Sequence, residues 1–205
     1  MLARLLAPLL ALVALAALSP ARADDLAVII ANKAYKSSHE VEFAHQDGER
    51  FKDAAIRALG VPKGRVLLRR DMTGNEMRVL FGEPDRPGEI ATLVSRTTRR
   101  LWVYYSGHGF PLVRAGSTPK PYLLPIDGVP AQLERTAISL SEVRSVLAAL
   151  KRQMAPGAEV ILVIEACFSS LSSKGPVQPR VSGTAFKPDL EGEATVVTLT
   201  AAGED

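Results

Sequence analysis

The chain has 205 residues, of which 47% are hydrophobic, 23% charged and 5% aromatic, a composition typical of one ordinary globular domain. Its formal net charge is +3, and it falls to +1 (23 basic and 22 acidic residues) without the two arginines of the first 23 positions. This balance, with no basic stripe interleaved with aromatic residues, excludes a nucleic-acid platform and gives no reason to expect attraction to an anionic membrane.

The first 23 residues have the pattern of a signal peptide. Arg4 precedes an apolar run, Leu5 to Leu18, and a small-x-small cleavage site at Ala23 follows it. The alternative is an uncleaved membrane anchor, for which the uncharged run is rather short. We therefore expect residues 24–205 to form one exported domain, periplasmic or secreted, without stable membrane association after cleavage.

Apolar runs and helical spacings alternate along the rest of the chain. Continuous apolar runs predict strands buried on both faces, and apolar residues spaced by three and four predict helices. In chain order we expect a strand at Leu26–Ala31, a helix at Gln46–Leu59, a strand at Val66–Leu68, helices at Thr73–Leu80 and Glu89–Thr98, a strand at Leu101–Tyr105, a helix at Ser139–Leu150, and strands at Val160–Ile164 and Ala194–Thr200. This order predicts an α/β fold, a three-layer αβα sandwich with a mostly parallel sheet.

Three segments add detail to this prediction. Thr73 and Glu76 have the spacing of a capping box at a helix start. Residues 110–130 are rich in proline and glycine and predict an excursion, such as a hairpin, outside the core sheet. Residues 171–193 predict a long polar loop, and loops of that length are usually functional or disordered.

Two of the predicted strands end in residues that suit nucleophilic catalysis. One leads through Glu165 to Cys167, the only cysteine, and the other leads to His108 between two glycines. If these strands are parallel neighbours, both side chains lie at the carboxyl edge of the sheet, where ligands gather. A thiolate with a histidine base can attack a carbonyl carbon, backbone N–H groups of Gly109 and Cys167 can stabilise the oxyanion, and the flanking glycines allow close approach to substrate. A lone cysteine can also be a buried small hydrophobic residue, and the pattern alone leaves both interpretations open.

The other polar residues have less specific interpretations. Asp47 lies in the first turn of its helix, on the stripe expected to face the sheet. It is either an acid favoured by the helix dipole or part of a site at the carboxyl edge. We expect His39 and His45 to be surface histidines. We expect Trp102, Tyr104 and Tyr105 to be structural residues of the core and its walls, and not to form a cofactor site. No Cys/His cluster has zinc spacing.

The segments Tyr104-Tyr-Ser-Gly-His-Gly109 and Glu165-Ala-Cys-Phe-Ser169 resemble the two motifs of the caspase-like peptidases (peptidase C14 family), in particular their metacaspase-like bacterial branch. The likeness extends from Leu26 to Asp205. Further matching positions are Asn32, Tyr35, Asp47, the segment Tyr122–Asp127 and the segment Thr198–Ala202. The resemblance implies a caspase-like fold that is incomplete at its C-terminus, because the family continues into a further strand and helices.

The resemblance also implies a cysteine-type endopeptidase that acts on proteins or peptides. It makes Cys167 the nucleophile, His108 the general base and acid, and Gly109 an oxyanion donor. A substrate-binding pocket of Asp47, Glu165 and Ser106 would accept a basic side chain, so cleavage would follow Arg or Lys. The chemistry needs no cofactor; some members of the family depend on calcium, but no acidic loop here places such a site.

Two positions depart from the family pattern, and they keep alternatives open. Glu165 stands where aspartate is usual, and Ser170 stands where glycine is usual. A catalytically inactive caspase-like module that binds proteins is therefore the alternative function, and a structural α/β domain with a buried cysteine is a third. The sequence does not define the oligomeric state. If the pocket prefers basic residues, the candidate self-cleavage points are Lys174, Arg180 and Lys187.

Overall fold

The computed structural model describes residues 24–83, 85–166, 171–172, 175–176 and 196–201. Its centre is a five-stranded sheet in the order β12-β9-β5-β1-β2, in which all neighbouring strands are parallel. The strands are β1 (Leu26–Ala31), β2 (Val66–Arg70), β5 (Arg100–Ser106), β9 (Glu159–Glu165) and β12 (Val196–Ala201). The order places β5 and β9, the strands before His108 and Cys167, next to each other.

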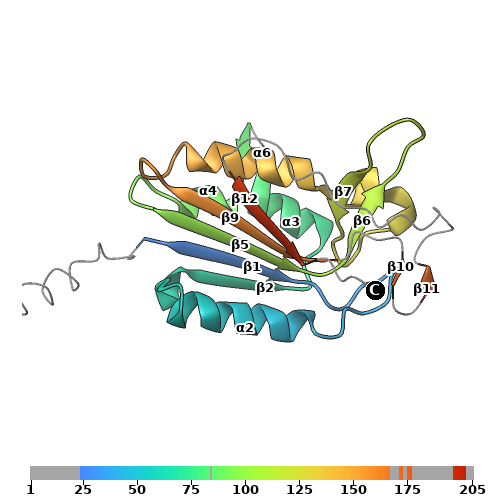
Figure 1. Ribbon diagram of the computed structural model, residues 1–205, viewed down its shortest axis with the longest axis horizontal. Coiled ribbons are helices and arrows are strands. Elements are labelled where there is room, and N and C mark those ends of the chain that lie inside the picture. The colour runs from blue at the N-terminus through green and yellow to red at the C-terminus, as the bar shows by residue number, and fades with distance from the viewer. Residues whose placement is uncertain (1–23, 84, 167–170, 173–174, 177–195, 202–205) are drawn as a thin grey trace, which may run out of the picture.

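Helices cover both faces of this sheet (Figure 1). Helix α2 (Ala44–Arg57) lies on one face. The other face carries α3 (Gly74–Phe81), α4 (Glu89–Leu93) and α6 (Leu140–Lys151). The predicted three-layer αβα sandwich is thus confirmed.

The apolar runs of the strands form the core between these layers. All six residues of β1 are at most 2% exposed, because helices bury the strand from both sides. Val28 and Ile30 point into the larger cluster with α3 and α6, whereas Ala27 packs with Ala55 of α2. Gly48 makes the α2 contact possible, since a Cβ there would lie only 2.8 Å from Cβ of Ala31.

A smaller antiparallel sheet extends from the carboxyl edge of the main sheet. It contains β6 (Gly109–Leu112), β7 (Lys120–Leu123) and β8 (Ile138–Ser139), and it confirms the predicted excursion. The remaining elements are the hairpin β3–β4 (Gly82–Glu83, Arg86–Pro87), helix α5 (Leu133–Thr136), the pair β10–β11 (Leu171–Ser172, Gly175–Pro176) and 3₁₀ helices at Lys63–Arg65 and Pro130–Gln132. Among the described residues, no helix has the length and apolarity that a membrane span needs.

Several element boundaries differ from those expected. Helix α4 ends at Leu93, five residues before the predicted end, because the hydroxyl of Thr98 accepts a hydrogen bond from N–H of Ser95 (3.0 Å) and stabilises a turn. Thr73 and Glu76 form the expected capping box of α3. The predicted loop at 171–193 contains the two short strands β10 and β11. The rest of this segment, like the expected signal peptide, lies outside the described residues.

Candidate active site

The carboxyl ends of β5 and β9 lie side by side. Their register pairs Ser106 with Glu165, and N–H of Gly107 donates to the carbonyl oxygen of Glu165 at 3.2 Å. The expectation that the two strands are parallel neighbours is therefore confirmed. His108 follows Ser106 by two residues and Cys167 follows Glu165 by two. Cys167 itself lies outside the described residues.

The backbone of His108 is held from two sides. Its N–H donates to the hydroxyl of Tyr35 at 2.8 Å. Its carbonyl oxygen accepts from the hydroxyl of Tyr105 at 2.9 Å and from N–H of Leu124 at 3.0 Å. The two tyrosine hydroxyls lie 3.3 Å apart. This network fixes where the His108 side chain leaves the end of the sheet.

The imidazole of His108 is held as well. Its Nε2 lies 2.9 Å from the carbonyl oxygen of His39, and because a carbonyl can only accept, Nε2 carries the proton in this bond. The rings of Tyr35 and His39 each lie 4.5 Å from the His108 ring. Burial lowers the pKa of His108 below its usual range, although the bond to His39 opposes this. His108 is therefore neutral at pH 7, with the lone pair of Nδ1 available as a base.

The structure shows why position 107 is occupied by glycine. A Cβ at this position would lie 2.4 Å from the hydroxyl of Tyr35 and 2.7 Å from that of Tyr105. Glycine is required here because the tyrosine pair under His108 occupies the space of a side chain. Gly109 is buried at the start of β6, opposite Leu123.

The three residues expected to bind substrate meet around Tyr104. Its hydroxyl donates a short hydrogen bond to Oε2 of Glu165. Burial, this bond and the charges of Glu165 and Asp47 raise the pKa of Tyr104 well above its usual range, while a hydrogen bond with Ser106 opposes them. Helix α2 contributes Asp47, and Phe51 of the same helix stacks on the Tyr104 ring at 4.4 Å. The sheet edge thus brings two carboxylates to one tyrosine.

The two carboxylates differ in their surroundings. The Asp47 side chain is 18% exposed and its Oδ1 accepts from Arg50 at 3.1 Å. Glu165 is exposed among the described residues, whereas Ser106 is 1% exposed. The additional methylene of Glu165, relative to aspartate, does not leave its carboxylate free, because the Tyr104 hydroxyl binds it.

Comparison with protein families matches residues 24–202 to the family described as the caspase domain. The chain belongs to the caspase-domain family. This confirms the resemblance seen in the two motifs. The family model is that of the C14 peptidases, so the domain is of the caspase-like peptidase kind.

The other comparisons add little to this assignment. Among solved structures, the crystal structure of protein GSU0716 from Geobacter sulfurreducens matches with a TM-score of 0.48 and 14% identity, over 70% of this chain and 50% of that one. The caspase-domain chain therefore spans about half the length of that structure. Comparison with curated proteins gives no match.

Sequence reasoning missed the structural roles of three residues of this caspase domain, one of which contacts His108 directly. His39 is not a free surface histidine, since its ring and carbonyl both contact His108. His45 is also only partly exposed, and its Nε2 lies 3.0 Å from Asp71. No pattern marks His39, whereas Asp71 could have been noticed as an acid directly after a strand at the carboxyl edge.

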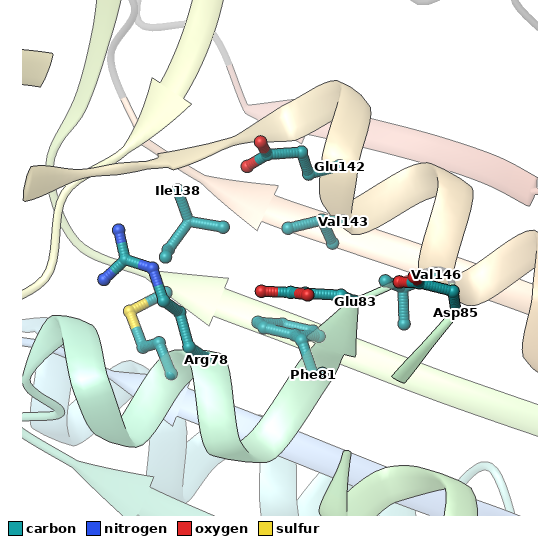
Figure 2. A pocket seen from close by; sticks show the side chains of 10 residues that line it. Arg78, Phe81, Glu83, Asp85, Ile138, Glu142, Val143 and Val146 are labelled. Atoms are coloured by element: carbon teal, nitrogen blue, oxygen red, sulfur yellow. The ribbon is translucent and has the colours of Figure 1, made fainter. Parts of the chain in front are cut away.

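One cavity of the caspase domain lies apart from these residues. It has a volume of about 290 Å³ and lies between α3 and α6 (Figure 2). Phe81 and Val143 line its apolar part, and Arg78, Glu83 and Glu142 lie around it. It shares no residue with the candidate active site. Among the described residues, no group of three His, Cys, Asp or Glu side chains could hold a metal ion.

Proposed function

We propose that the chain is a cysteine endopeptidase that uses a Cys167–His108 dyad and cleaves peptide bonds after Arg or Lys. The observation that carries this proposal is the register of β5 and β9, which pairs Ser106 with Glu165. The catalytic histidine and the cysteine each follow one of these paired residues by two positions. Adjacent parallel strands are about 4.8 Å apart, so equal offsets favour a short distance between the two side chains.

In this mechanism, Nδ1 of His108 removes the proton of the Cys167 thiol. The thiolate attacks the substrate carbonyl carbon, and N–H of Gly109 donates to the oxyanion. His108 then gives its proton to the leaving amine as the C–N bond breaks. Water, activated by the same imidazole, hydrolyses the thioester and restores the thiol. The bond from Nε2 to His39 supports this role, because it directs the unprotonated Nδ1 toward the proton to be moved.

The acidic residues support the preference for basic side chains. The Tyr104 hydroxyl binds Glu165, and the charges of Glu165 and Asp47 both raise the pKa of Tyr104, which supports a common site for the two acids. A guanidinium or ammonium group between them would form charge-assisted hydrogen bonds. A substrate arginine would compete with Arg50 for Asp47, and Arg50 is poorly suited to win because its side chain is 73% exposed.

The proposal includes the exported state expected from residues 1–23. The mature domain, residues 24–205, would act in the periplasm or outside the cell on protein or peptide substrates. Size comparison of the chain from the periplasm with the chain made without export would show removal of the leader, and an unchanged mass would contradict it.

The test is hydrolysis of paired fluorogenic peptides that end in Arg, Lys or Asp, with and without calcium. Cys167→Ala and His108→Ala should abolish cleavage. Asp47→Asn and Glu165→Gln should each lower kcat/KM for the Arg peptide by about 10- to 100-fold, the effect of losing a hydrogen bond to a charged group. Cleavage after Asp instead of Arg would keep the peptidase and refute the pocket.

Glu159→Gln is the matched control for Glu165→Gln. Glu159 is at the opposite end of β9, where its carboxylate pairs with Arg100 at 3.2 Å. The pair is exposed, so its loss should leave kcat/KM unchanged. No cleavage by a folded chain under any condition would refute the peptidase and favour the catalytically inactive, protein-binding module.

A further inference from the structure

Asp71 lies directly after β2, at the carboxyl edge of the sheet that also carries His108. Its φ of 51° is in the left-handed region, which most residues avoid and which Asp, Asn and Gly tolerate best. Its own N–H donates to the carbonyl oxygen of Ala31 at 3.1 Å. The chain therefore turns sharply here, with the carboxylate at the edge of the sheet.

Each carboxylate oxygen of Asp71 contacts a different segment. Oδ1 accepts from N–H of Lys33 at 2.7 Å and from N–H of Ala34 at 3.0 Å. Oδ2 lies 3.0 Å from Nε2 of His45 in α2, although this nitrogen has no hydrogen bond of good geometry. Partial burial raises the pKa of Asp71, but the N–H bonds and His45 outweigh it, so the pKa lies below its usual range. The carboxylate is thus ionised and well bound at neutral pH.

The two N–H groups belong to the start of the loop from Lys33 to Val41. N–H of Val41 donates to the carbonyl oxygen of Lys33 at 3.2 Å, so the two ends of this loop are joined at the residue that Asp71 holds. Lys36 is tied to Ile126 by a backbone bond of 2.8 Å. Between its ends, the loop presents Tyr35 and His39.

These two loop residues are the ones that hold the catalytic histidine. Tyr35 accepts from the backbone N–H of His108, and the carbonyl of His39 binds its Nε2. A displacement of the loop would move both at once. Asp71 has no contact with His108 among those described, so any effect on catalysis passes through the loop.

We propose that Asp71 is a positioning residue of the active site, whose carboxylate holds the Lys33–Val41 loop in the shape that fixes the His108 imidazole. This inference rests on the proposed peptidase function. It predicts that losing the carboxylate lowers kcat more than it changes KM. KM should change little because helix α2, which carries Asp47 of the acidic pocket, remains packed on the sheet through Gly48 and Phe51.

Two substitutions at Asp71 separate its possible roles. Asp71→Gly removes the carboxylate and keeps a backbone that accepts a positive φ without strain. Asp71→Asn keeps an oxygen for the two N–H groups, tolerates the same φ and loses only the charge. We expect kcat for the Arg peptide to fall about 10- to 100-fold in Asp71→Gly, because a displaced catalytic group lowers the rate by about this factor. KM should stay within about threefold of the wild-type value. Asp71→Asn should retain most of the wild-type kcat.

Nitrogen-15 NMR of the histidine rings gives a readout that does not depend on peptidase activity. The chain has only three histidines, so the His108 signals can be assigned by their loss in His108→Gln. In the wild-type chain the protonated nitrogen should be Nε2, and Asp71→Gly should change this to a mixture of tautomers. If Asp71→Gly is folded and keeps the wild-type ring spectrum, the positioning role is refuted.

The controls separate failure of this inference from failure of the proposed function. Asp25→Ala removes another aspartate, 2% exposed, whose Oδ1 accepts from N–H of Arg100 at the opposite edge of the sheet (3.0 Å). It should lower stability without changing kcat or the His108 spectrum. If the wild-type chain cleaves no peptide, the peptidase proposal fails, while the ring spectrum still decides whether Asp71 positions His108. Should Asp71→Gly not fold, Asp71→Glu shifts the carboxylate by one methylene and is judged by the same spectrum.

Discussion

The tyrosine pair beneath His108 allows a prediction that does not depend on activity. Tyr35→Phe and Tyr105→Phe each remove one buried hydroxyl and leave the ring in place, so neither creates a large cavity. We expect Tyr35→Phe to be the more destabilising of the two. The reason is the strength of the hydrogen bond that each substitution removes from a group with no other partner.

Tyr35→Phe leaves the backbone N–H of His108 without its acceptor at 2.8 Å. A buried donor without a partner costs about 1–3 kcal/mol. In Tyr105→Phe, by contrast, both carbonyl groups that lose the hydroxyl keep another donor, and the Tyr35 hydroxyl loses only a longer contact of 3.3 Å. The oxygen of His108 keeps N–H of Leu124 at 3.0 Å, and the oxygen of Leu124 keeps the amide of Asn32 at 3.4 Å. We therefore expect a cost of about 1 kcal/mol or less for Tyr105→Phe.

Urea unfolding followed by circular dichroism would measure both costs. With a slope of about 2 kcal/mol/M, typical of a domain of this size, Tyr35→Phe should lower the midpoint by about 0.5–1.5 M. Tyr105→Phe should lower it by about 0.5 M or less. A midpoint for Tyr105→Phe at or below that for Tyr35→Phe would refute the hydrogen-bond assignment around His108.

Three other substitutions test the pKa, the packing and the helix cap. Burial holds the pKa of His108 below its ordinary value of 6.5, so the unfolded chain binds this proton more tightly. The unfolding free energy should therefore fall as pH drops below 6.5, and in urea titrations His108→Gln should show a weaker dependence of this free energy on pH. Gly48→Ala should lower the thermal midpoint, because its Cβ would meet Ala31 at 2.8 Å, whereas Gly64→Ala, with no atom within 4 Å, should not; equal midpoints would contradict the packing of α2. Thr73→Ala should cost about 1 kcal/mol in urea unfolding through loss of the α3 cap, and no change would count against that cap.

The fold was predictable because local sequence signals agreed with one architecture. The run Leu26–Ala31 has no polar residue, which is typical of a strand covered on both faces, and the structure has β1 at those residues. Thr73 and Glu76 identified the start of α3 by local hydrogen bonding alone. The end of α4 was predicted wrongly, because the competing bond from Ser95 to Thr98 gives no periodic signal.

The sequence alone identified the family motifs, the strands that carry His108 and Cys167, and the acids Asp47 and Glu165, because each belongs to a short segment whose pattern is local. Only the tertiary structure decided the register of Ser106 with Glu165, the placement of both acids around Tyr104, and the loop that binds His108. These contacts join residues as far apart as Asp71 and Lys33, or His39 and His108, which become neighbours only when parallel strands end at a common edge. No spacing in the sequence encodes such contacts, since they depend on how the layers pack.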